Sequence, residues 1–197
     1  MSEQRAQSGE AGRAQTGDGS GNGRGNGGES GSPWVGASAL AEAVRLREEG
    51  QQEEARQRLL ALSAAHPEHA ETAYQTAWAH DVLGLEAEAV PHYERALALT
   101  PGLDPESRSG ALLGLGSTYR ILGRYEDAVT TLRRGTEEFP DDGALRAFLA
   151  MALHNTGEHQ EAMRLLLRLL AAGSTDPAVG RYRRAIEYYA DDLDATV

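Results

Sequence analysis

The sequence predicts an all-α fold, a helical-hairpin solenoid of about four repeats with a C-terminal capping helix and a disordered N-terminal tail. Three observations predict it. From about residue 38 onward, alanine, leucine, glutamate and arginine recur at helical spacing. Glycine and proline interrupt this pattern about every 12 to 17 residues, which leaves three or four helical turns between breaks. Several columns of residues also recur with one shared offset, which indicates stacked repeats.

The N-terminal segment, residues 1–35, is expected to be a flexible tail. Ten glycines fall within its first 33 residues, among serine, glutamine and charged side chains. Such a composition has little apolar surface to bury against the entropy cost of ordering. A phosphate-binding loop is a weak alternative, because no strand precedes the glycines and no helix opens from them.

The repeat is visible in four glycines, separated by 34, 39 and 34 residues: Gly50, Gly84, Gly123 and Gly157. Small residues keep the same offsets in two further columns: Ala43, Ala77, Gly116 and Ala150, then Ala55, Ala89, Ala128 and Ala162. An apolar column follows them: Leu59, Tyr93, Leu132 and Leu166. Pro67, Pro101 and Pro140 mark three repeat ends, where the fourth copy has Ser174. Chance does not readily produce several columns in step.

These columns divide the region 36–192 into repeats at about 36–69, 70–103, 109–142 and 143–176. In each repeat a left-handed glycine ends the first helix, and proline ends the second in the first three copies. Pro91 lies inside the second helix of the second repeat, where it should remove a backbone hydrogen bond and bend the helix. Five extra residues precede the third repeat, and Asp104-Pro105 there reads as an N-cap followed by proline at the first helical position.

The last predicted helix covers residues 177–191. One face of it is apolar, with Val179, Tyr182, Ile186 and Tyr189, while arginines 181, 183 and 184 lie mostly off that face. A helix with one apolar and one charged face is suited to cover the exposed end of a solenoid.

A 34-residue helix-turn-helix with these columns resembles the tetratricopeptide repeat. The third copy carries the resemblance best, with Leu112-x-x-Leu115-Gly116-x-x-Tyr119 followed by Gly123, Tyr125, Ala128, Leu132 and Pro140. The chain also resembles small uncharacterised bacterial proteins made of such repeats without a catalytic domain, some of which are believed to dimerise.

The resemblance implies a groove lined by the first helices of successive repeats. Its positions in this sequence are Leu40, Val44, Arg47, Tyr74, Trp78, Asp81, Leu113, Ser117, Arg120, Ala147, Met151 and His154. Tyr, Trp and Arg dominate the energetics of many protein interfaces. Alternatively, Tyr74 and Trp78 only pack between neighbouring repeats. The carboxylate clamp of chaperone-associated repeats is improbable, because it needs lysines and this chain has none.

Composition argues against several other classes. The net charge is −11, from 30 acidic and 19 basic residues, which disfavours nucleic acid as a partner. Without cysteine there is no disulfide, thiolate metal site or cysteine nucleophile. We see no secretory signal and no apolar run of membrane-spanning length, so a cytoplasmic location is expected. The six histidines show no zinc-helix spacing, and no serine-nucleophile motif occurs.

We therefore expect no enzyme, cofactor, bound metal or small-molecule substrate. The first hypothesis is a cytoplasmic scaffold or adaptor that binds a protein or peptide partner in the predicted groove. The second is a structural homodimer that buries the same surface in self-association. A metal-dependent hydrolase built on the histidines and an RNA-binding helical repeat are weaker alternatives.

Overall fold

The computed structural model describes residues 34–194, and throughout this range the secondary structure is helical, with turns and short connections. Nine helices follow one another there: α1 (Ala37–Glu48), α2 (Gln52–Ala65), α3 (Ala70–Asp81), α4 (Glu86–Ala98), α5 (Pro105–Ile121), α6 (Tyr125–Glu138), α7 (Gly143–Thr156), α8 (His159–Gly173) and α9 (Pro177–Asp191). The all-α prediction is confirmed for these residues. The first 33 residues of the predicted tail lie outside the described part.

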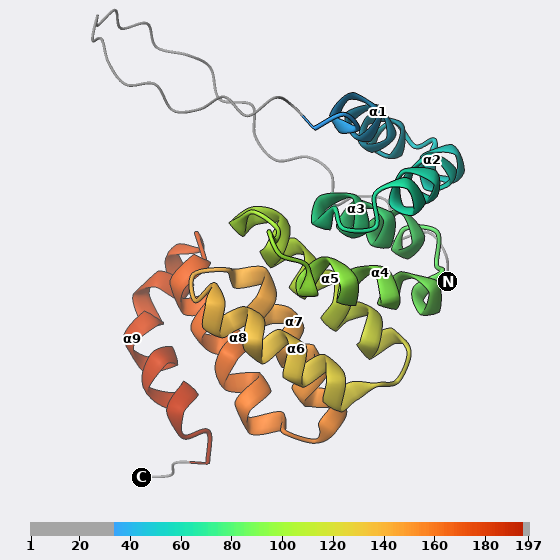
Figure 1. Ribbon diagram of the computed structural model, residues 1–197. Coiled ribbons are helices and arrows are strands. Elements are labelled where there is room, and N and C mark those ends of the chain that lie inside the picture. The colour runs from blue at the N-terminus through green and yellow to red at the C-terminus, as the bar shows by residue number, and fades with distance from the viewer. Residues whose placement is uncertain (1–33, 195–197) are drawn as a thin grey trace, which may run out of the picture. The chain divides into compact units, whose positions relative to one another are not determined.

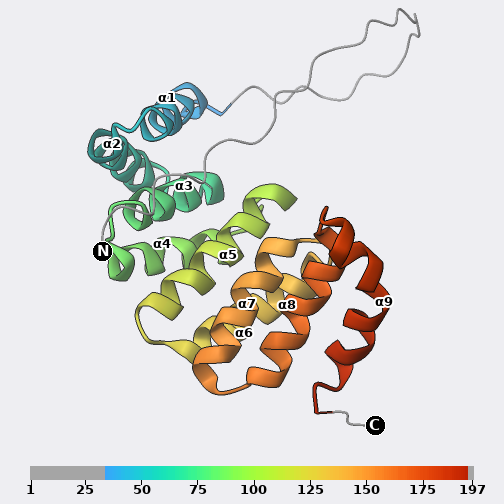
Figure 2. The same cartoon turned by 180° about the vertical axis from the view of Figure 1, so that it is seen from behind.

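The helices pack in chain order, each against the next, as Figure 1 shows. The first helices of successive hairpins also contact one another, α1 with α3, α3 with α5 and α5 with α7. The second helices, α2, α4, α6 and α8, make no such contacts with each other in the range 34–194. We call α1, α3, α5 and α7 the first-helix layer, and Figure 2 shows it from behind.

The turns within the hairpins use the predicted glycines. Gly50, Gly84, Gly123 and Gly157 have φ values of 84°, 74°, 75° and 87°. This left-handed region is open to glycine at no steric cost and strained for residues with a Cβ. Each hairpin therefore reverses direction at the column of glycines.

The predicted small-residue columns lie where helices approach most closely. Ala77 and Ala128 are completely buried. An added Cβ at Gly116 would collide with the Leu132 side chain of the following helix. At Gly114 it would collide with the Tyr93 ring of the preceding hairpin. The columns thus record packing within hairpins and between them.

The structure shows the predicted helix start at Asp104-Pro105 and the proline inside a helix at Pro91. The Asp104 carboxylate caps α5 by accepting hydrogen bonds from the backbone N–H groups of Glu106 (2.9 Å) and Ser107 (3.0 Å), with Pro105 at the start of the helix. The extra residues lengthen both the connection and α5, which has 17 residues. Pro91 lies inside α4, which runs without interruption from Glu86 to Ala98.

The C-terminal helix α9 packs on α8 alone among the described helices. Asp176 caps it, accepting a hydrogen bond from the Ala178 N–H at 2.8 Å. Its apolar stripe is only partly covered, because Tyr182 and Tyr189 are exposed while Val179 and Ile186 are half-buried. Within the helix only Ala190 is fully buried.

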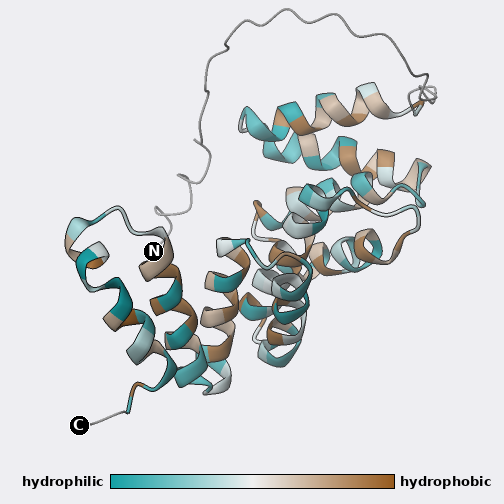
Figure 3. Cartoon of the chain, turned by 90° about the vertical axis from the view of Figure 1, so that its left-hand side faces the viewer, coloured by the Kyte–Doolittle hydropathy of each residue, from teal (hydrophilic) through white to brown (hydrophobic). Residues whose placement is uncertain are grey.

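Hydropathy alternates around the helices, and Figure 3 shows hydrophilic and hydrophobic bands side by side on them. This is the pattern of helices that bury one face and expose the other. Along residues 34–194, none of the helices combines the length and the apolar character needed to cross a membrane.

Candidate partner-binding surface

The residues of the predicted groove all lie on the first-helix layer, three on each of α1, α3, α5 and α7. They are not equally accessible. Trp78, Met151 and His154 are exposed, whereas Leu40, Val44, Asp81, Leu113, Ser117, Arg120 and Ala147 are half-buried and Arg47 and Tyr74 are buried. The predicted positions therefore divide into packing residues and residues that a partner could touch.

Arg47, Tyr74 and Trp78 form one cluster between α1 and α3. The Arg47 guanidinium lies 3.5 Å from the centre of the Trp78 ring, and the Tyr74 and Trp78 ring centres are 5.8 Å apart. Burial lowers the pKa of Arg47 and raises the pKa of Tyr74 to about 12. The tyrosine is therefore neutral near pH 7, and Trp78, 39% exposed, is the member that faces solvent.

Tyr74 and Asp81 hold neighbouring hairpins together. The Tyr74 hydroxyl lies against Gly110 of α5, where an added Cβ would collide with it. The Asp81 carboxylate accepts hydrogen bonds from the Thr118 hydroxyl of α5 at 3.2 Å and from the Tyr93 hydroxyl of α4 at 3.5 Å. For these two residues, packing between repeats accounts for the side chain.

The far end of the layer brings three predicted residues together around an open cavity of about 530 Å³. We call it the α7–α8 cavity. Its lining is Arg120, Ala150, Met151, His154, Asn155, His159, Ala162, Met163 and Leu166. Met151 is 42% exposed, and the walls are mainly apolar. Arg120, Met151 and His154 were predicted as groove residues, but His159, Met163 and Leu166 of α8 were not.

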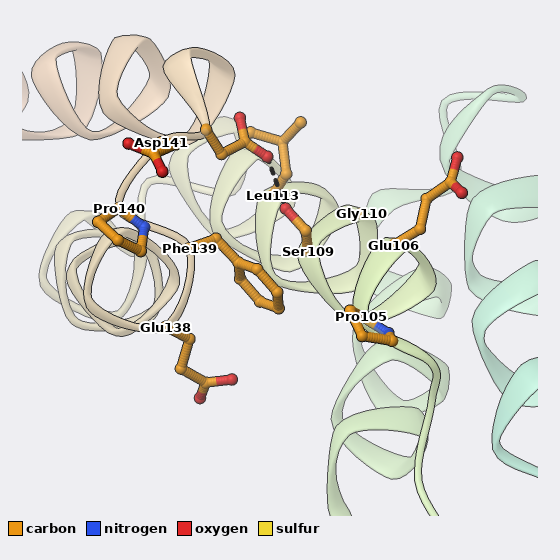
Figure 4. Close-up of a pocket in the computed structure, with 10 residues that line it drawn as sticks. Pro105, Glu106, Ser109, Gly110, Leu113, Glu138, Phe139, Pro140 and Asp141 are labelled. Atoms are coloured by element: carbon orange, nitrogen blue, oxygen red, sulfur yellow. Dashed lines mark hydrogen bonds between the residues drawn. The ribbon is translucent and has the colours of Figure 1, made fainter.

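A second open cavity, of about 540 Å³, lies where the end of α6 meets α5. Figure 4 shows the Phe139 side chain pointing from the end of α6 toward α5, near Leu113 and Gly110. The rim is acidic, with Glu106, Glu138, Asp141 and Asp142.

Two of these four carboxylates are already engaged. Arg108 and Arg134 donate hydrogen bonds to Glu138, and the Arg108 bond is the largest cause that lowers its pKa to about 2. The Ser109 hydroxyl donates to Asp142 at 2.6 Å, the bond drawn in Figure 4. This cavity therefore has an apolar floor and an acidic rim, and the charge of Glu138 on that rim is neutralised by Arg108 and Arg134.

The histidines pair at two places. The rings of His80 and His92 stack at 5.2 Å between α3 and α4, and those of His154 and His159 lie 4.7 Å apart at the α7–α8 turn. His80 Nδ1 lies 2.7 Å from the Thr76 carbonyl oxygen of its own helix. In the range 34–194, no three His, Asp or Glu side chains are grouped so that they could hold a metal ion.

The stacked hairpins, the left-handed glycine turns and the layer of first helices define a helical-repeat protein. A family model described as tetratrico peptide repeat matches residues 69–193. The chain belongs to the tetratricopeptide repeat family.

One curated relative is Superkiller protein 3 of Schizosaccharomyces pombe (strain 972 / ATCC 24843). It is 31% identical over 109 residues, which is 52% of this chain and 8% of that protein. The chain thus spans less than a tenth of this relative, and the likeness concerns a stretch of repeats.

Among solved structures, the MamA RS-1 ArsTM double mutant superposes with a TM-score of 0.64 at 18% identity, covering 82% of this chain and 88% of that chain. A putative kinesin light chain from Podosopora anserina, with nearly identical TPR-like repeats, has a TM-score of 0.59 at 25% identity, covering 81% and 88%. Both likenesses concern the fold.

Proposed function

We propose that this chain is a non-catalytic protein-interaction module that binds a segment of another protein on the first-helix layer. Tetratricopeptide repeat domains generally bind proteins. The observation that carries the proposal for this chain is the exposure of two large apolar side chains on that layer, Trp78 at 39% and Met151 at 42%.

Exposed large apolar side chains are a common mark of an interaction site, and Met151 also lines the α7–α8 cavity. Trp78 is held in place by Arg47, so little side-chain freedom is lost when a partner packs on it. Met151 has three rotatable bonds and adapts to different contact shapes. The two residues lie on α3 and α7, so a segment that touched both would cross several hairpins.

The test is comparative affinity capture with the full chain as bait. Trp78→Ala and Met151→Asp each remove one exposed anchor, and Leu122→Ala removes an equally exposed side chain from the turn after α5. We expect one set of proteins to bind the wild type and Leu122→Ala but to be lost from both anchor variants. A truncated tryptophan anchor typically costs 2 kcal/mol or more, roughly a 30-fold loss of affinity.

All variants should keep the helical signal of the wild type, while Trp78→Ala should melt at a somewhat lower temperature because it loses the contacts with Arg47 and Tyr74. Identical capture by all four proteins would contradict the proposal. Loss of self-association in the anchor variants, in place of loss of another protein, would favour the homodimer.

A further inference from the structure

The α7–α8 cavity occupies a place that is covered in the preceding repeats. Met163 and Leu166 line it and are 46% and 42% exposed. Their counterparts one and two repeats earlier are at most 9% exposed: Val129 and Leu132 on α6, and Val90 and Tyr93 on α4. The same positions of the repeat are thus buried in α4 and α6 and open in α8.

At the second repeat the cover over this place is the first helix of the next hairpin. The Tyr93 ring, which corresponds to Leu166, lies directly against Gly114 of α5. Gly135 of α6 lies against Leu145 of α7, because an added Cβ would approach the leucine Cδ2 to 2.7 Å. The cavity therefore lies on the side of α8 where the first helix of a further hairpin would pack, and we call this place the seat.

Helix α9 follows α8 in the chain but does not fill this seat. It contacts α8 and, unlike each earlier first helix, makes no contact with the preceding member of the layer, α7. Tyr182 on its apolar stripe remains 61% exposed.

The charges around the cavity indicate what kind of helix would fit. Arg120, His154 and His159 line it, and none of its lining residues is a carboxylate. The Nε of Arg120 is buried and has no hydrogen-bond partner in the part of the chain described. The Arg120 side chain as a whole is only half-buried and lines the cavity, so its guanidinium can donate to an incoming carboxylate.

The same charges disfavour α9 as the occupant, whether its own or that of a second copy. Three arginines, 181, 183 and 184, lie within four residues of that helix. Against them the helix has two carboxylates, Glu187 and Asp191, so α9 does not offer Arg120 a predominantly acidic partner. At the cavity itself an acidic helix would meet the opposite charge of Arg120, because no carboxylate lines the walls.

We propose that the α7–α8 cavity binds an acidic amphipathic α-helix of a partner protein. The apolar face of this helix packs on Met151, Met163 and Leu166, and one of its carboxylates accepts a hydrogen bond from Arg120. An apolar spacing of i, i+3 or i+4, and i+7 would present such a face to the cavity. The inference rests on the proposed function and assigns the partner class for one part of the surface.

The test uses a displayed library of 16-residue peptides, selected on the full chain. Leucines occupy fixed positions at helical spacing, and each remaining position is drawn from Glu, Lys and Gln. We expect enrichment of Glu over Lys. The best peptide is then synthesised with a fluorescent label, and its binding is measured by anisotropy, together with a copy that has Lys in place of every Glu.

Arg120→Gln is expected to weaken the Glu peptide about tenfold, the usual size for one hydrogen bond to a charged group. Met163→Asp should abolish binding, and Arg120→Glu should reverse the preference toward the Lys peptide. Val82→Asp is the matched control and should leave the affinity unchanged, because it adds the same charge at an exposed side chain (39%) outside the cavity lining. Helical signal and melting temperature show whether each variant is folded.

Enrichment of Lys peptides, or no enrichment at all, would overturn the inference. The inference would also be overturned by a peptide whose affinity falls in Trp78→Ala and not in Met163→Asp. That result would leave the proposed function in place, with the partner bound near Trp78 and not in the α7–α8 cavity. If the wild type sediments as a dimer and Met163→Asp as a monomer, a second copy fills the cavity and both proposals fail.

Discussion

At the scale of single residues, close packing explains why certain positions must be small. Gly116 stands in a column whose other members are alanines, yet Leu132 packs so closely on it that a methyl group would not fit without movement. Gly180 on α9 presents the opposite case, since an added Cβ would meet nothing within 4 Å. The two glycines occur in similar helices for different physical reasons.

We predict that Gly116→Ala lowers the free energy of unfolding by about 1–2 kcal/mol, because overpacking outweighs the better helix propensity of alanine. Gly180→Ala should raise the stability of α9 by about 0.5–1 kcal/mol, since only the propensity changes. Urea unfolding followed by circular dichroism measures both. A loss of stability at both positions would contradict the packing account.

The stacked histidines between α3 and α4 predict a dependence on pH. Burial, with His80 and Arg95 nearby, lowers the pKa of His92 from its ordinary value of 6.5 to about 4. Arg95 lies 3.3 Å from His92 Nδ1, so this nitrogen must be the acceptor. In the unfolded chain His92 takes up its proton near pH 6.5, whereas in the folded chain it does so only near pH 4.

Lowering the pH from about 6.5 to 5 should therefore destabilise the wild type, because the unfolded state binds the proton first. Above pH 6.5 this contribution is fully present. His92→Gln removes this difference and should make the curve shallower in this window, while the lowered pKa of His69, also caused by burial, leaves part of the slope. The effect is separable from that of paired carboxylates such as Glu138, whose lowered pKa matters only below about pH 4.5. Parallel curves for wild type and His92→Gln would contradict the assignment.

At the scale of helices, aspartates fix where several of them begin. The Asp142 carboxylate accepts hydrogen bonds from the Ala144 and Leu145 N–H groups of α7 at 2.9 and 3.1 Å, and from the Ser109 hydroxyl of α5. Asp104 accepts backbone hydrogen bonds from Glu106 and Ser107, both on its own helix. One cap therefore joins two hairpins and the other serves one helix.

Asp104→Ala should cost about 1 kcal/mol of stability, the usual value of an N-cap. Asp142→Ala should cost about 2 kcal/mol, because Ser109 also loses its acceptor. Asp142→Asn keeps a capping oxygen and should recover most of the loss. Chemical denaturation of the three variants checks the order, and equal losses for both alanine variants would show that the Ser109 bond adds nothing.

The sequence predicted the helices well, because each repeat column follows from a packing or backbone requirement. Gly50 and its counterparts need a left-handed turn, and Ala128 fits a contact too close for a larger side chain. Such requirements recur in every copy and are readable as spacing. The position of α9 could not be predicted in this way. It packs on α8 without contacting α7, an arrangement that the other described hairpins do not repeat.

The candidate surface was predicted less completely. The register placed Trp78, Met151 and Arg120 on first helices, where they lie, but it did not separate them from Tyr74, which packs between repeats. It also treated Leu166 as a packing residue like Leu132. The exposure of Leu166 depends on where the following helix lies, and a column of similar residues does not contain that information.

At the scale of the whole molecule, the described repeats stack in chain order and leave apolar side chains open along one layer and at the α7–α8 cavity. Tyr74 packs against α5, and Asp81 accepts hydrogen bonds from Thr118 and Tyr93. In contrast, nothing in residues 34–194 covers Trp78, Met163 or Leu166 fully. The central claim is that this surface is kept for another protein and is not buried between copies of the chain.

Sedimentation velocity of the full chain, over a wide concentration range, tests this claim most directly, with the wild type beside Trp78→Ala and Met163→Asp. We predict a folded monomer for all three proteins at every concentration. A wild type that dimerises as its concentration rises, beside variants that remain folded monomers, would contradict the claim and show that the surface joins two copies of this chain.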